Sequence, residues 1–166
     1  MRHFTLSDKK LRGVHRRLRA LERWAAGFHG QFHPRGPDMT RYLNWKIPVP
    51  NTLVQGPQAR IEHQAFCAQQ MLEAAAHLSR AADRSQGYYR VACILVWPWL
   101  HQSEVAVFHD RDYYLGFLGQ GNGLAPERLS DRLALRVPAH FIEHGHDVTQ
   151  ADDELPVQWW CIGEPA

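Results

Sequence analysis

Cysteine and long apolar runs are both scarce in this sequence of 166 residues. The three cysteines, Cys67, Cys93 and Cys161, are odd in number and share no C-x-x-C spacing, which argues against a disulfide framework and against a zinc cluster. The longest apolar run, VACILVWPWL, is half the ~20 residues that a membrane helix needs, and the N-terminal residues lack the apolar stretch of a signal peptide. We therefore expect buried free thiols and a cytoplasmic protein without membrane contact.

The serine nucleophile elbow and the phosphate-binding loop are also absent. No G-x-S-x-G elbow occurs, so no serine has the setting of a hydrolase nucleophile. The glycine-rich segment GQGNG follows a predicted helix and is not followed by Lys-Ser or Lys-Thr, unlike a phosphate-binding loop. We expect a protein that uses no cofactor and catalyses no reaction.

The residues that are present have the composition of an ordinary folded domain. Hydrophobic residues make up 45% of the chain and charged residues 22%, which is typical of a globular protein rather than a disordered one. A chain of this length buries roughly two thirds of its unfolded surface in one core. With no internal repeat or linker, residues 1–166 are expected to form a single domain.

Hydrophobic periodicity predicts an α+β fold. Apolar residues at three- and four-residue steps predict long helices over about 7–29 and 57–80, and shorter helices follow Asp110 and lie near Glu127 to Leu135. Runs rich in β-branched and aromatic residues predict strands within 86–98, 103–110 and 157–164, while prolines confine 41–57 to an edge strand or an extended arm. The expected architecture is a small antiparallel sheet of about three to four strands with helices packed on one face.

Charge is placed unevenly along the chain. Residues 1–35 contain nine Lys or Arg against two acidic residues, whereas residues 91–166 contain four Arg against eleven acidic residues. The two ends thus carry net charges of about +7 and −7. The fold could bring these ends together to neutralise each other, or it could present them to partners of opposite charge.

The segment HFIEHGH, residues 140–146, raises the possibility of a metal site. Its first five residues match the H-x-x-E-H pattern, in which His140 and His144 would bind zinc and Glu143 would polarise a water molecule. Such a site needs a third ligand far downstream, and Pro138 and Gly145 leave little room for a supporting helix. A metal-dependent hydrolase is therefore an alternative hypothesis, beside a surface loop or helix end with no bound metal.

A row of arginines offers a second alternative. Arg12, Arg16, Arg19 and Arg23 fall on one face of the first predicted helix. Such a row could bind the phosphates of a nucleic acid, or it could be a solvated face or one half of intramolecular ion pairs.

Three segments carry a resemblance to a known family. The segments IPVPNTLVQGP, SEVAVFHDRDYY and WWCIGE resemble a family of uncharacterised bacterial proteins, DUF3916. The resemblance implies a compact bacterial cytosolic protein and carries over no catalytic residues. Because small proteins of this kind are often immunity proteins, we expect one that binds and neutralises an antibacterial toxin domain.

On this hypothesis the acidic C-terminal half forms the partner surface. Charged residues would steer a cationic toxin and surround the interface, and a tryptophan would anchor it. The expected residues are Asp147, Asp152, Asp153, Glu154 and Trp159. We expect at least one of Trp159 and Trp160 to lie in the core instead, because successive strand residues face opposite sides.

Overall fold

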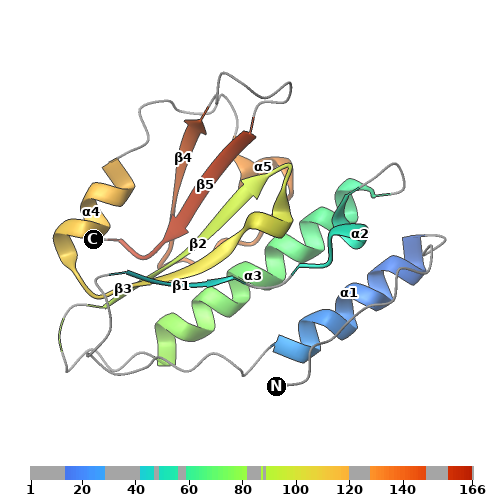
Figure 1. Cartoon of the computed structure of the whole chain (residues 1–166), viewed down its shortest axis with the longest axis horizontal. Coiled ribbons are helices and arrows are strands. Elements are labelled where there is room, and N and C mark those ends of the chain that lie inside the picture. The colour runs from blue at the N-terminus through green and yellow to red at the C-terminus, as the bar shows by residue number, and fades with distance from the viewer. Residues whose placement is uncertain are drawn as a thin grey trace.

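A computed structural model describes residues 14–28, 42–46, 49–55, 59–81, 87, 89–119, 128–148 and 157–165 of the chain. A five-stranded antiparallel sheet with the order β1-β3-β2-β5-β4 forms its centre (Figure 1). The strands are β1 (Tyr42–Lys46), β2 (Arg90–Trp97), β3 (Glu104–Phe108), β4 (Ile142–Val148) and β5 (Val157–Gly163). The α+β class is confirmed, and the sheet is larger than expected because the arm and the histidine segment each contribute a strand.

Helices surround this sheet. They are α1 (Val14–Phe28), α2 (Asn51–Val54), α3 (Ile61–Ala81), α4 (Arg111–Gly119) and α5 (Leu129–Arg132), with a 3₁₀ turn, η2, at Leu100–Gln102. The long helix α3 crosses one face of the sheet, and α1 runs along the outer side of α3 (Figure 1). Asp110 caps α4 as predicted, because its Oδ1 accepts a hydrogen bond of 2.8 Å from the Tyr113 backbone N–H. No helix in the described ranges is long and apolar enough to cross a bilayer.

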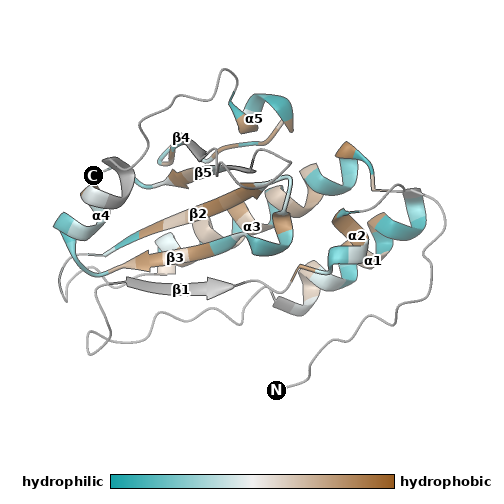
Figure 2. Ribbon diagram, turned by 45° about the horizontal axis from the view of Figure 1, so that its top comes forward, coloured by the Kyte–Doolittle hydropathy of each residue, from teal (hydrophilic) through white to brown (hydrophobic). Residues whose placement is uncertain are grey.

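The alternation of side chains along the strands gives the sheet two buried faces. The first face packs against α3 and α1 and forms the main core, which is the helix-covered face that the sequence predicts. The second face packs against Tyr114 of α4 and includes Phe108 and Cys161. Strands β2 and β3 are largely hydrophobic, as expected for strands buried on both faces, whereas the first turns of α1 are hydrophilic (Figure 2).

A buried carboxylate fastens the end of the last strand to three other elements. Glu164, only 3% exposed, accepts hydrogen bonds from the Ser79 hydroxyl of α3 and from the Val91 backbone N–H of β2, the latter at 3.0 Å. The hydroxyl of Tyr114 in α4 donates to the backbone carbonyl of Glu164. The carboxylate thus ties α3 to β2, and the backbone carbonyl of the same residue ties α4 to the end of β5.

Candidate functional site

The histidine segment forms β4, an edge strand of the sheet. Strand β4 stands last in the strand order and pairs with β5, from Ile142 opposite Gly163 to Val148 opposite Val157. Residues 149–156, which include three of the acidic residues expected to bind a partner, connect these two strands. The strand was not predicted, because a sequence of mixed histidines, acids and glycine lacks the β-branched enrichment of a typical strand.

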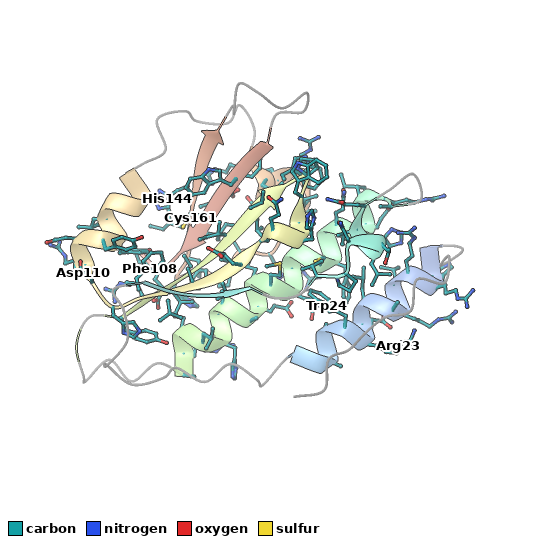
Figure 3. The ribbon with its side chains drawn as sticks, in the orientation of Figure 1. Arg23, Trp24, Phe108, Asp110, His144 and Cys161 are labelled. Carbon is teal, nitrogen blue, oxygen red and sulfur yellow. The ribbon has the colours of Figure 1, made fainter. Side chains whose placement is uncertain are left out.

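The extended backbone separates the residues of the H-x-x-E-H pattern. Glu143 pairs with Ile162 and therefore lies on the main-core face, whereas His144 pairs with Cys161 on the second face (Figure 3). His140 is exposed in the turn before the strand, and its ring packs edge-on against Phe141. Among the described residues, no three His, Cys, Asp or Glu side chains come close enough together to hold a metal ion.

Glu143 has a structural partner. One carboxylate oxygen accepts the Ser130 backbone N–H at 3.2 Å, and the other accepts the Ser130 hydroxyl. Ser130 belongs to the first turn of α5, whose N–H groups have no partners within the helix. The carboxylate therefore ties α5 to the sheet margin, a role that the spacing of the histidines gave no reason to expect.

His144 and Cys161 are cross-strand neighbours with limited reactivity. Cys161 is fully buried, and burial raises the pKa of its thiol to about 12, so the thiol is protonated at neutral pH. Burial lowers the pKa of the half-buried His144, which favours the neutral imidazole. All three cysteines are buried and free, as the sequence predicts.

The expected partner surface is described only in part. Asp147 lies in β4, and Asp152, Asp153 and Glu154 lie outside the described residues. Trp159 is half-buried and packs against the second-face cluster. Its neighbour Trp160 is 2% exposed in the main core, which confirms that at least one of the two is a core residue.

The arginine row divides into exposed residues and one buried neighbour. Arg16, Arg19 and Arg23 are exposed on α1, and Arg12 lies outside the described residues. Arg17, by contrast, is only 7% exposed, and its Nη1 donates to the backbone carbonyls of Thr52 at 2.7 Å and Leu53 at 3.2 Å. Burial lowers the pKa of its guanidinium.

Arg17 belongs to a polar junction around the short helix α2. Gln64 of α3 donates from Nε2 to the Val54 carbonyl at 3.1 Å, so α1 and α3 both supply donors to the end of α2. The Gln55 amide contacts Nδ1 of His101 in η2 at 3.0 Å. One signal for the buried position of Arg17 was available, because it stands three and four residues before Ala20 and Leu21 on the apolar side of α1.

Comparison with known proteins identifies the family. No curated protein and no solved structure matches the chain. The family model described as "Protein of unknown function (DUF3916)" matches residues 22–164, from the middle of α1 to the buried carboxylate after β5. The chain therefore belongs to the DUF3916 family.

Proposed function

We propose that this protein is a bacterial immunity protein, which binds a cognate antibacterial toxin domain and blocks it without catalysing a reaction. The topology of the β4–β5 hairpin carries the proposal. Asp147 belongs to β4, and Asp152, Asp153 and Glu154 follow it in the sequence before β5 begins. Acidic residues that are close together along the chain can attract a cationic partner and speed association.

Strand β5 anchors this hairpin in the sheet and the core. Strand β5 pairs with β2 along six residue pairs, and Trp160 and Ile162 bury their side chains in the main core. Strand β4 is an edge strand, so alternate backbone N–H and C=O groups point away from β5. A partner could add main-chain hydrogen bonds along this edge while the acids of the connection meet its basic residues.

The engagement of Glu143 also supports a binding role. A general base must reach the substrate or a water molecule, but both oxygens of this carboxylate are hydrogen-bonded to Ser130. His144 is directed to the other face of the sheet. The side chains that most resemble an active site in the sequence thus serve packing and capping in the fold.

A binding titration tests the proposal. The probe is the toxin domain encoded beside the gene for this protein, in a catalytically inactive form, titrated by calorimetry at low and high salt. We expect tight binding to the unmodified chain and at least tenfold weaker binding to D152N/D153N/E154Q, because the steering and rim charges are lost.

The matched control removes three exposed acids elsewhere, as E22Q/E62Q/E73Q, and therefore changes the net charge equally. This control should bind within threefold of the unmodified chain. Equal losses in both variants, or the absence of any toxin gene beside this one, would count against the proposal.

A further inference from the structure

The exposed arginines of α1 form a narrow basic stripe, defined as Arg16, Arg19 and Arg23. At 100° per residue the three side chains fall within about 60° of one another around the helix, and they extend over roughly 10 Å along its axis. Trp24 turns toward α3, whereas Arg23 lies on the opposite, outer side of α1 (Figure 3). The stripe is therefore displayed on the side of α1 that faces away from the sheet.

The stripe has more positive charge than the one acidic residue of α1, Glu22, can neutralise. No carboxylate in the described ranges forms an ion pair with any of the three guanidinium groups, and the hydrogen bond given for the stripe runs from Nε of Arg23 to the Arg19 carbonyl at 3.3 Å. The positive charge is available to an external partner.

The placement of these charges also opposes helix formation. Arg16 and Arg19, and Arg19 and Arg23, are like-charge pairs at spacings of three and four, which repel each other on a helix surface. A bound anion would relieve this repulsion.

We infer that this stripe binds the sugar–phosphate backbone of a nucleic acid. Helix α1 contains arginines and no lysine. The planar guanidinium group of arginine matches phosphate better than the ammonium group of lysine does. Successive phosphates of one strand are ~3.4 Å apart along a duplex, so the length of the stripe matches about three of them. The contacts involve the backbone alone, and the stripe therefore confers affinity without sequence specificity.

A nucleic acid fits this surface better than a membrane or an acidic protein. Membrane-surface helices insert an apolar face, but Leu21 and Trp24 of α1 are committed to the core. The large exposed apolar side chains of the described residues lie on α3, α4 and β4, not on α1. A protein interface would need such anchors near the stripe, whereas phosphate binding depends mainly on charge.

Fluorescence anisotropy with the full chain tests the inference. The probes are a labelled 20-nucleotide poly(U) RNA and a labelled 20-base-pair DNA duplex at 50 and 200 mM salt. We expect R16Q/R19Q/R23Q to weaken binding of the better probe at least tenfold at 50 mM salt. The slope of log K against log salt should become shallower by about 2 to 3, because roughly three phosphate contacts are lost.

Two further variants separate the stripe from general charge effects. R80Q/R111Q/R136Q removes three exposed arginines from other elements and should weaken binding less than threefold. R16K/R19K/R23K keeps the charge of the stripe and should retain affinity within about fivefold. Circular dichroism and thermal melting check that the stripe variants fold as the unmodified chain does.

Several outcomes would overturn the inference. These are failure of the unmodified chain to bind either probe at 50 mM salt, equal losses in the two glutamine variants, and loss of affinity in the lysine variant as large as in R16Q/R19Q/R23Q. Stripe-dependent binding to vesicles containing 30% phosphatidylserine, without binding to either probe, would assign the stripe to membranes instead. None of these results depends on the toxin-binding proposal, which concerns the β4–β5 hairpin.

Discussion

At the scale of single residues, Glu143 shows how a motif can match a sequence pattern and serve another purpose. Replacing it with alanine removes the acceptor for both the N–H and the hydroxyl of Ser130. We expect E143A to lower the free energy of unfolding by about 1 to 3 kcal/mol, measured by urea denaturation, because these donors lose a charged acceptor.

Glu73 supplies the control for this prediction. It is exposed on α3 and accepts hydrogen bonds from Gln69 and Gln70 of the same helix. E73A should change stability by less than about 0.5 kcal/mol. Similar small effects for both variants would mean that Glu143 does not hold α5 to the sheet.

His144 predicts a pH dependence with a definite sign. Burial lowers its pKa in the folded state, so the unfolded chain binds a proton more readily. The stability associated with this residue is therefore complete above pH ~6.5, the ordinary histidine pKa, and decreases as the pH falls below that value. Urea midpoints between pH 8 and 5 should show this decrease, with a flatter profile for H144Q. A decrease of the urea midpoint in H144Q as steep as that in the unmodified chain would contradict the prediction.

Arg17 is the residue on which sequence reasoning was least informative. A row of charges on an amphipathic helix indicates an exposed face. Helix periodicity places Arg17 on the apolar face of α1 instead. The groups that its buried guanidinium binds there can be known only from the tertiary structure. Its partners are backbone carbonyls 35 and 36 residues away in α2, a four-residue helix. Neither that helix nor its carbonyl groups could be predicted from residue types.

Truncation of Arg17 tests this contact. R17A leaves the Thr52 and Leu53 carbonyls without their donor and opens space beside the core, so we expect a loss of roughly 2 to 3 kcal/mol in urea denaturation. R16A, on the exposed stripe one position earlier, should alter stability by no more than about 0.5 kcal/mol. A loss for R17A as small as that for R16A would show that the buried guanidinium contributes little.

At the scale of elements, the contact of α4 with the sheet depends on a glycine. A methyl group at Gly163 would lie 3.0 Å from both the Ala92 Cβ and the Tyr114 hydroxyl oxygen, and 3.3 Å from the Val91 carbonyl oxygen. We expect G163A to cost about 1 to 3 kcal/mol by thermal or chemical denaturation, because β2 and α4 must shift to admit it.

Gly116 provides the opposite case within α4 itself. A methyl group there meets no atom within 4 Å, and alanine favours the helix more than glycine does. G116A should therefore stabilise the protein by roughly 0.5 to 1 kcal/mol. If G163A, like G116A, did not lower the free energy of unfolding, Tyr114 of α4 would not be packed closely on Gly163 of β5.

The elements that the sequence predicted are those with strong periodicity. Helices α1, α3 and α4 and strands β2, β3 and β5 lie within the expected segments, because their apolar residues repeat at the period of a helix or fill a buried strand. Strand β1 was one of two alternatives predicted for its segment, and β4 was missed, since edge strands carry polar residues and pair through backbone groups that residue types do not reveal. Because β4 was not predicted, residue types also gave no sign that Glu143 and His144 face opposite sides of the sheet.

At the scale of the whole molecule, charge of opposite sign is carried by separate elements. The basic stripe lies on α1, which runs along α3 (Figure 1), whereas the acidic residues expected to bind a partner belong to β4 and to the sequence between β4 and β5. The main core joins α1 and β5 across α3 into one packed body. The toxin-binding proposal concerns β4 and β5 and the nucleic-acid inference concerns α1, so each can fail without the other.

We propose that a protein partner covers the β4–β5 hairpin. Hydrogen–deuterium exchange tests this for the chain alone and in complex with the toxin domain encoded beside its gene. Complex formation should slow exchange most strongly for the amides of β4 and of residues 149–156, with little change in α1. Protection confined to α1 or α3, or a toxin domain that leaves the exchange of the whole chain unaltered, would contradict this proposal.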